Sequence, residues 1–213
     1  DQLLMDISHE LRTPLTRMKV ALEFIEDSRA KQNLQDDIAD MEKMVTEILE
    51  TARLHHKYAD LKKQPTNLIA ILKHTLKAFE HQPPGIETGG LPSEIEARVD
   101  PEQVKTVFEK VFNNAIKYCE AESKPVRVSC ELGESYAVIR ITDFGIGIPE
   151  EDLAHIFEPF YRVDKSRTKD TGGYGLGLSL CKTIMEAHDG KIEVQSKPEE
   201  GTTVSLFFPL GEN

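Results

Sequence analysis

Residues 1–25 read DQLLMDISHELRTPLTRMKVALEFI, and their apolar side chains recur in steps of three or four residues. These side chains are Leu4, Ile7, Leu11, Leu15, Met18, Leu22 and Ile25. After a polar break at residues 26–32 the same spacing returns, at Leu34, Ile38, Met41, Val45, Ile48 and Ala52. Such heptad-like spacing predicts two long helices that pair as an antiparallel hairpin.

One hairpin cannot cover both apolar stripes, so we expect a second copy of the chain to complete a four-helix bundle. The alternative is that the stripes pack on the rest of the same chain. The segment that follows contains Lys62, Lys63 and Pro65 and continues neither stripe. The expected division is therefore a helical domain over 1–58, a linker over 59–65 and a second domain over 66–213.

The second domain mixes the two periodicities. Helices are expected over 67–79, 101–118 and 176–188, and strands over 95–99, 126–132, 137–143, 192–195 and 203–208. Asp100 and Pro101 suit the cap and the first position of the helix that they precede. Helices combined with mostly antiparallel strands indicate a two-layer α/β sandwich, so the fold class is α + α/β. Residues 83–92 are too irregular to assign.

Composition excludes several classes of protein. A net charge of −11 argues against binding to nucleic acid, which requires Lys and Arg to neutralise phosphates. The three cysteines have neither paired nor metal-type spacing, so we expect reduced thiols in a reducing compartment. No apolar run approaches the ~20 residues that cross a bilayer. The chain starts inside a helical pattern, and we expect it to be part of a longer protein.

His9 lies two positions from apolar residues on either side, about 200° around a helix from each, and so projects from the flank of the bundle. A lone histidine there would be a solvated surface residue. Glu10 adjoins it, however, Thr13 is one turn along on the same face, and Pro14 removes a helical hydrogen bond beside it. A neutral imidazole can attack phosphorus, and a neighbouring carboxylate can take its proton.

Residues 8–15, SHELRTPL, resemble the phosphoacceptor box of sensor histidine kinases. The resemblance implies that His9 is phosphorylated, that Glu10 acts as base and that Thr13 supports a phosphatase activity.

Further segments resemble the nucleotide-binding boxes of the same family, in the family's order. They are NNAIKY at 113–118, DFGIGIP at 143–149, FEPFYR at 157–162, GGYGLGL at 172–178 and GTT at 201–203. In this resemblance the polar segment 164–171 corresponds to a mobile lid over the triphosphate. The alternative is a disordered charged loop, and both interpretations can hold because a lid must open. The glycine segment is neither a P-loop nor a Rossmann fingerprint.

The resemblance implies that ATP and Mg²⁺ are bound by a defined set of residues. They are Asn114, Lys117, Tyr118, Asp143, Gly145, Gly147, Phe160, Arg162, Lys165, Arg167, Gly173, Gly175, Leu176, Gly177, Leu178, Thr202 and Thr203. Asn114 would be the Mg²⁺ ligand and Asp143 would accept from the adenine amino group. A threonine at 202 or 203 would also contact adenine, and the choice between them stays open.

Lys110 departs from the family pattern, which has a second asparagine one turn before Asn114. Residues four apart are neighbours on a helix, so Lys110 is expected to face the metal and the triphosphate. A protonated lysine supplies charge but cannot ligate Mg²⁺, and it cannot easily activate water. The alternative is that its side chain extends into solvent with little effect.

The resemblance implies the core of a sensor histidine kinase, with the sandwich of the histidine-kinase, gyrase and heat-shock-chaperone ATPases. Its expected reactions are ATP-dependent autophosphorylation of His9 and transfer to an aspartate on a response-regulator receiver domain. The alternatives are a gyrase-type ATPase, disfavoured by Lys110 and the phosphoacceptor helix, and a nucleotide-binding scaffold or phosphatase-dominated protein. The expected location is the cytoplasmic side of a bacterial inner membrane, anchored by an N-terminal portion outside this sequence.

Overall fold

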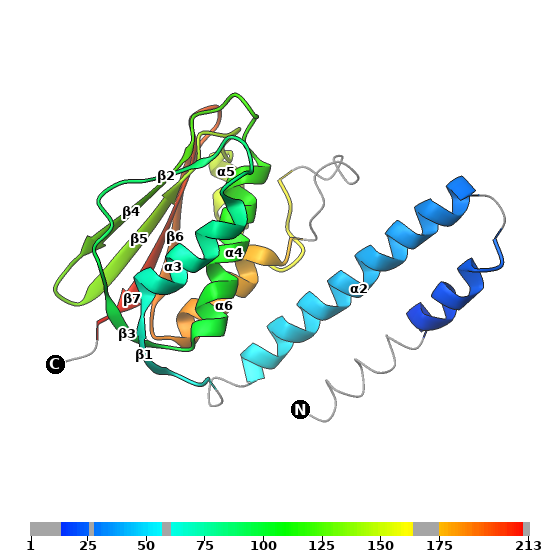
Figure 1. The fold of residues 1–213 in the computed structure, drawn as a ribbon, viewed down its shortest axis with the longest axis horizontal. Helices are drawn as coiled ribbons and strands as arrows, with labels where there is room; N and C mark the ends of the chain where they lie inside the picture. The colour runs from blue at the N-terminus through cyan, green and yellow to red at the C-terminus, as the bar shows by residue number, and fades with distance from the viewer. Residues whose placement is uncertain (1–13, 26–27, 57–60, 164–174, 211–213) are drawn as a thin grey trace. The chain divides into compact units, whose positions relative to one another are not determined.

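In a computed structural model of the chain, the described residues are 14–25, 28–56, 61–163 and 175–210 (Figure 1). The chain divides into two compact units, one ending at residue 58 and the other beginning at residue 59. We call them the helical unit and the α/β unit. Of the helices in these ranges, none combines the length and apolar character that crossing a bilayer requires.

The helical unit contains a helical segment over 14–22 and the long helix α2, Ser28–His56. Leu15, Leu22 and Ile38 form its buried centre, with Ile25 and Val45 packed against them. Three other residues of the predicted stripes remain 42–46% exposed, namely Met18, Leu34 and Met41. A hairpin has only one seam where its two helices meet, so part of a heptad stripe stays uncovered in a single chain.

The α/β unit contains a five-stranded sheet in the order β2-β4-β5-β7-β6, in which β2 and β4 are parallel and the other pairs antiparallel. Its elements are β1 Gln64–Asn67, α3 Leu68–Leu76, a 3-10 turn Lys77–Phe79, β2 Ile86–Thr88, β3 Glu96–Val99, α4 Pro101–Lys117, β4 Val126–Leu132, β5 Tyr136–Thr142, α5 Glu150–Leu153, α6 Gly177–Ala187, β6 Lys191–Lys197 and β7 Gly201–Pro209. The strands β1 and β3 form a separate antiparallel ribbon. Helices α3, α4 and α6 cover one face of the large sheet (Figure 1), which confirms the two-layer sandwich.

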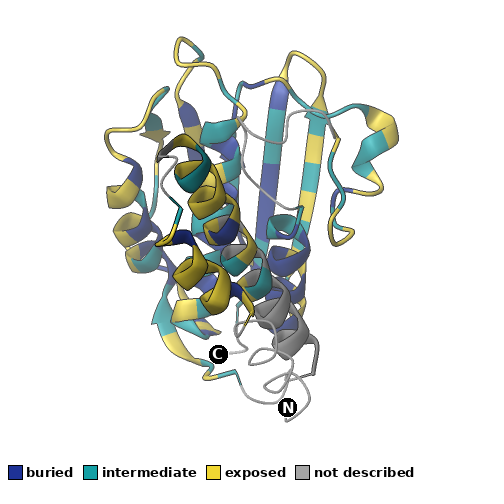
Figure 2. Ribbon diagram, turned by 90° about the vertical axis from the view of Figure 1, so that its right-hand side faces the viewer, coloured by how far each residue is buried: buried dark blue, intermediate teal, exposed yellow. Residues whose placement is uncertain are grey.

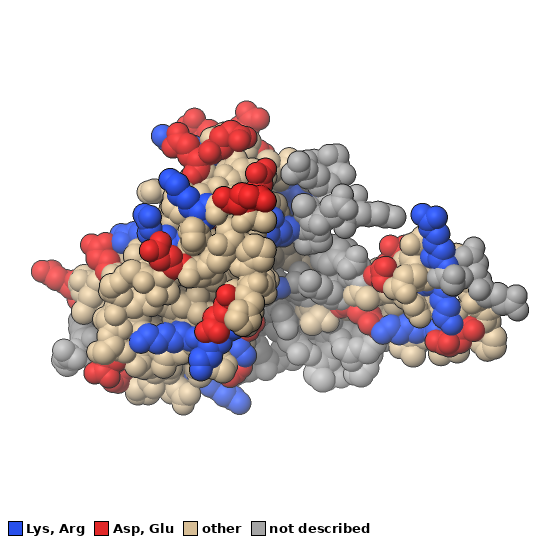
Figure 3. Space-filling view, turned by 45° about the horizontal axis from the view of Figure 1, so that its top comes forward, with Lys and Arg blue, Asp and Glu red and all other residues tan. Residues whose placement is uncertain are grey.

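The core lies between these helices and the sheet (Figure 2). Phe108 and Phe112 of α4 and Phe208 of β7 are fully buried there. The ring centre of Phe108 lies 6.5 Å from that of Phe112 and 6.1 Å from that of Phe208. The alternation of β5 places Ala137, Ile139 and Ile141 in this core. On the face shown in Figure 3, acidic and basic side chains of the α/β unit are interspersed, and acidic ones gather at one end.

Two helix starts follow directly from capping side chains. Asp100 Oδ1 accepts from the backbone N–H groups of Glu102 and Gln103, which confirms the predicted cap of α4. Asn67 Oδ1 caps α3 in the same way and also accepts from the Ile95 N–H, 3.3 Å away. One amide therefore joins the start of α3 to the entry of β3.

The structure differs from the sequence prediction at three short elements. Gln64 and Pro65 belong to β1 and not to a linker; Pro65 is tolerated because β1 pairs on one side only, in a two-stranded ribbon. Residues 86–88, inside the unassigned region, form the edge strand β2. The one-turn helix α5 was not predicted, because four residues carry no readable periodicity.

Replacing Phe108 by alanine should lower the free energy of unfolding of the α/β unit by about 3–5 kcal/mol, because the cavity would lie between α4 and the sheet. Urea titration followed by fluorescence or circular dichroism measures the change. Leu132→Ala is the control, since Leu132 is 63% exposed and should change stability by about 0.5 kcal/mol or less. Equal losses for the two variants would contradict this account of the core.

Candidate active site

The three residues expected to act on the phosphoryl group, His9, Glu10 and Thr13, lie outside the described residues. So do Lys165, Arg167 and Gly173 of the expected lid and its glycine segment. The other predicted site residues lie in the α/β unit and can be placed.

Asp143 is at the centre of the site, directly after β5, and only 7% exposed. Its Oδ1 accepts from the backbone N–H of Gly145 at 3.0 Å and of Thr202 at 3.1 Å. The backbones of Asp143 and Thr202 also exchange two hydrogen bonds, at 2.8 and 3.3 Å. Both donors to the carboxylate reach Oδ1, which leaves Oδ2 as the oxygen for a ligand.

Burial raises the pKa of Asp143, although the N–H groups of Gly145 and Thr202 lower it in part. An ionised carboxylate at this depth is costly unless another donor reaches it. The exocyclic amino group of an adenine is a neutral donor of the kind that such an oxygen accepts from. The local electrostatics therefore fit the predicted role of Asp143.

Glycines let the backbone close tightly around Asp143. A Cβ on Gly145 would lie 2.2 Å from the carbonyl oxygen of Tyr118, and one on Gly147 would lie 1.9 Å from that of Lys197. Gly147 also has a φ of 69°, which favours glycine. Side chains at either position would displace these segments, so the turn after β5 depends on glycine.

The structure separates the two candidate threonines. Thr202 adjoins Asp143 through its backbone, and its hydroxyl lies 2.8 Å from Ser196 Oγ. The Thr203 hydroxyl instead lies 3.0 Å from Thr142 Oγ1. Successive side chains of β7 point to opposite faces of the sheet, so only Thr202 is brought to Asp143.

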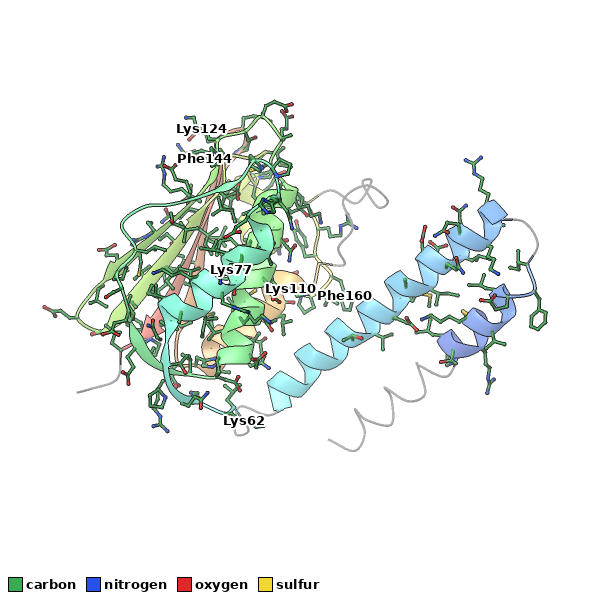
Figure 4. All side chains as sticks on the ribbon, viewed as in Figure 1. Lys62, Lys77, Lys110, Lys124, Phe144 and Phe160 are labelled. Atoms are coloured by element: carbon green, nitrogen blue, oxygen red, sulfur yellow. The ribbon has the colours of Figure 1, made fainter. Side chains whose placement is uncertain are left out.

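Sequence analysis missed Ser196, which joins three segments of the site. Its hydroxyl donates to the Gly201 carbonyl at 2.8 Å and accepts from the Ile148 N–H at 2.9 Å. No signal pointed to it, since a serine near the end of a polar strand is ordinary. Phe144 was also missed. Its ring centre lies 5.4 Å from Lys124 Nζ (Figure 4) and 5.6 Å from Arg127 Cζ.

Helix α4 contributes the predicted amide and cation of the site. Asn114 is half-buried, and Lys117 Nζ lies 4.8 Å from the ring centre of Tyr118, the residue that ends the helix. The Tyr118 carbonyl accepts from the Ile146 N–H at 3.2 Å, so the end of α4 is tied to the loop after Asp143. Asn114, Lys117 and Tyr118 occupy the last two turns of α4, close to that loop.

Lys110 lies beside the first residue of α6 (Figure 4). Its Cδ is 3.8 Å from the position that a Cβ on Gly177 would take. Burial raises the pKa of Cys181, one turn into α6, to about 12, and the charge of Lys110 acts in the opposite direction. The cation therefore stands at the α6 end of the site, not on a remote surface.

The start of α6 suits an anion. Among the residues that the structure describes, no side chain caps this helix at Leu176, and the N–H groups of an uncapped helix start can bind an anion. Just before it, the Gly175 carbonyl accepts from the Phe160 N–H at 3.0 Å, and a Cβ on Gly175 would lie 2.4 Å from the Tyr161 carbonyl oxygen. This pairing brings together described residues on either side of the segment predicted to form the lid.

Phe160 adopts a φ of 67° and its side chain is 55% exposed, although it is large and apolar. Arg162 is half-buried and Leu178 is half-buried within the first turn of α6. Leu176 differs from these, because it is 2% exposed and packs in the core. Its side chain supports the loop, and only its backbone can face a nucleotide.

The arrangement fits a nucleotide. Asp143 would hold the base, the glycine turns would approach the ribose and phosphates, and the start of α6 would meet the phosphates. Within the described ranges, no cluster of three or more His, Cys, Asp or Glu side chains could hold a metal alone. Mg²⁺ commonly binds through one or two protein oxygens together with substrate phosphates and water, and Asn114 offers such an oxygen.

Family models match most of the chain. The model of the histidine kinase-, DNA gyrase B- and HSP90-like ATPases matches residues 99–212. The model of the His Kinase A (phospho-acceptor) domain matches residues 1–57.

Among curated proteins, the signal transduction histidine-protein kinase ArlS of Staphylococcus aureus is 35% identical to the chain over 219 aligned positions. The alignment covers 97% of this chain and 48% of ArlS. The chain therefore spans about half the length of the curated relatives it matches.

Solved structures share the fold at lower identity. Full-length ShkA in complex with AMPPNP has a TM-score of 0.77 at 22% identity, covering 98% of this chain and 45% of ShkA. The Acinetobacter baumannii histidine kinase AdeS has a TM-score of 0.67 at 22% identity, covering 96% of this chain and 98% of AdeS. With an ATPase sandwich and a phosphoacceptor domain in one sequence, the chain belongs to the sensor histidine kinases of two-component signal transduction.

Proposed function

We propose that this chain is the catalytic core that transfers the γ-phosphoryl group of ATP to His9. The observation that carries the proposal is Asp143, a buried carboxylate whose Oδ1 is held by two backbone N–H groups and whose surroundings exclude side chains at Gly145 and Gly147. A buried carboxylate held in this way suits the amino group of an adenine, and the same sequence contains a phosphoacceptor domain.

In the proposed reaction a neutral imidazole nitrogen of His9 attacks the γ-phosphorus, and the bond from phosphorus to the bridging oxygen breaks to release ADP. The proton displaced from the ring passes to Glu10 and then to solvent. Bound Mg²⁺ would neutralise phosphate charge, with Asn114 as its protein ligand. Lys117, Lys165 and Arg167 would add positive charge. Thr13 would position a water in line with phosphorylated His9, so that the water attacks the phosphorus and His9 and inorganic phosphate are released.

We further propose that the chain acts as a homodimer and passes the phosphoryl group to a response-regulator receiver domain. The 42–46% exposure of Met18, Leu34 and Met41 supports dimerisation, because a second hairpin would cover them. The functional division into a phosphotransfer domain over 1–58 and a nucleotide-binding domain that begins with β1 is part of this proposal. So is a location on the cytoplasmic side of a membrane, with the anchor outside this sequence.

Incubation with γ-labelled ATP and Mg²⁺ should label the wild-type chain and not His9→Gln. The label should be acid-labile and alkali-stable, as phosphohistidine is, and Glu10→Gln should slow labelling by roughly a hundredfold through loss of the base. Surface-histidine variant His81→Gln is the control and should label normally. An acid-stable label, or a label that survives in His9→Gln, would refute the assignment.

Replacing Asp143 by asparagine should weaken ATP binding by about 10- to 100-fold. The NH₂ group of the new side chain would face the adenine amino group, and both are hydrogen-bond donors. Affinity for GTP should change less, since guanine presents an acceptor at that position. Calorimetry with both nucleotides measures the ratio. Glu131→Gln, on an exposed residue paired with Arg140, is the matched control.

The same carboxylate predicts a pH dependence. Burial raises the pKa of Asp143, so its ionised form is lost at a higher pH than for an ordinary aspartate. ATP affinity should therefore fall as the pH drops through that raised pKa, and Asp143→Asn should not show this fall. A wild-type affinity that stays constant down to the ordinary range of aspartate would contradict the role.

Lys110 is the feature that keeps open the alternative of a phosphatase-dominated protein with weak kinase activity, which the family matches do not favour. Beside Gly177 it supplies positive charge where the family has an asparagine, so the Mg²⁺ requirement of ATP binding should be altered. Lys110→Asn should lower the half-saturating Mg²⁺ concentration about tenfold, equivalent to ~1.4 kcal/mol. Lys105→Asn, on the same helix and near Glu109, should not. Identical magnesium titrations for wild type and Lys110→Asn would remove this alternative.

A further inference from the structure

The residues that lead into the α/β unit are held on it before β1 begins. The Lys62 N–H donates to Asp100 Oδ2 at 3.0 Å, and Lys63 Nζ lies 2.8 Å from Asp189 Oδ2 (Figure 4 labels Lys62). The two acceptors belong to opposite helix ends, the start of α4 and the residue just beyond the end of α6.

Asp100 serves two purposes with one carboxylate. Oδ1 accepts from the first turn of α4, at the N–H groups of Glu102 and Gln103, while Oδ2 accepts from Lys62. Its own backbone N–H donates to His188 Nε2 at 2.9 Å. The bond to His188 is therefore one of the contacts that position the carboxylate and, with it, the attachment of Lys62.

His188 is 1% exposed and uses both ring nitrogens. Nδ1 lies 2.7 Å from the Ile184 carbonyl oxygen, which can only accept, so Nδ1 holds the proton. Nε2 receives the Asp100 N–H, which can only donate. A second proton, on Nε2, would face another donor, so the charged ring is incompatible with the bond to Asp100.

Three charged groups face this ring. Lys63 comes from the entering segment, Asp100 from the start of α4 and Asp189 from the end of α6. Burial lowers the pKa of His188 and Lys63 adds to that effect, while the Ile184 carbonyl, Asp100 and Asp189 oppose it. The folded arrangement thus favours the neutral ring. Its stabilisation is complete above the ordinary pKa of about 6.5 and is lost as the pH falls below that value.

We propose that His188 is a proton-sensitive positioning residue that, when neutral, holds Lys62 and Lys63 on the α/β unit and, when protonated, releases them. Release would move the first held residue from Lys62 to Gln64, the start of β1, and free about 7 Å of additional chain between the two units. Acid would in this way lengthen the connection between the phosphoacceptor helices and the nucleotide pocket. Only this last effect rests on the proposed phosphotransfer.

The test uses NMR to measure amide hydrogen exchange and amide chemical shifts in the full 213-residue chain at pH 7.5 and pH 5.5. After correction for intrinsic exchange, protection of the Asp100 amide in wild type should be about tenfold lower at pH 5.5 than at pH 7.5. This ratio is expected if the His188 imidazole has its ordinary pKa of about 6.5 once its bond to Asp100 is broken. The Lys62 amide shift should follow the same transition. Ile139, in the central strand β5, should keep its protection and report an intact fold.

Two variants separate the ring's charge from its hydrogen bonds. His188→Gln can place an amide oxygen near the Nε2 position and cannot titrate, so protection of Asp100 should be equal at the two pH values. His188→Asn can keep the donor to Ile184 but not the acceptor for Asp100, so protection should be low at both. Should His188→Asn fail to fold, wild type and His188→Gln still decide the matter.

Unchanged protection of Asp100 in wild type, or an equal fall in His188→Gln, would overturn the proposal. The exchange measurement uses no nucleotide, so its result is independent of whether His9 is phosphorylated. Autophosphorylation at the same two pH values, at saturating ATP, then tests the functional effect. Its rate should change with pH more in wild type than in His188→Gln.

Discussion

The site depends on the carboxylate of Asp143, where the end of β5 meets the start of β7. Two backbone N–H groups fix Oδ1, and two further backbone hydrogen bonds join Asp143 to Thr202. This close approach requires Gly145, and it requires Gly201, where a Cβ would lie 2.2 Å from the Asp143 carbonyl oxygen. The buried aspartate thus determines where glycine must occur and which oxygen remains for a base.

The sequence was sufficient for the fold wherever a pattern repeats over many residues. The heptad spacing, the alternation of β5 and the cap at Asp100 each predict an element that the structure contains. Short elements escaped, because β2 and α5 have three and four residues and no periodicity. Pro65 was assigned to a linker although it lies in β1, because proline is excluded from central strands but not from a ribbon that pairs on one side only.

For the candidate site, motifs predicted residues but not their contacts. Spacing could not choose between Thr202 and Thr203, whereas the register of β7 directs one hydroxyl to Ser196 and the other to Thr142. Ser196 was missed because its role comes from the pairing of β6 with β7, which brings it to Gly201 and Thr202, and from the loop after β5, which brings it Ile148. Lys110 was recognised only as a departure, and its place beside Gly177 required the packing of α4 on α6.

Helix α4 connects the two ends of the α/β unit. Its first turn is capped by Asp100, which also receives Lys62, and its last residues meet the loop after Asp143 through the Tyr118 carbonyl and the Ile146 N–H. Its 17 residues span about 25 Å as one rigid element packed in the aromatic core. A displacement at the cap would therefore reach Asn114 as a movement of the whole helix, because a helix buried by Phe108 and Phe112 cannot deform locally without opening the core.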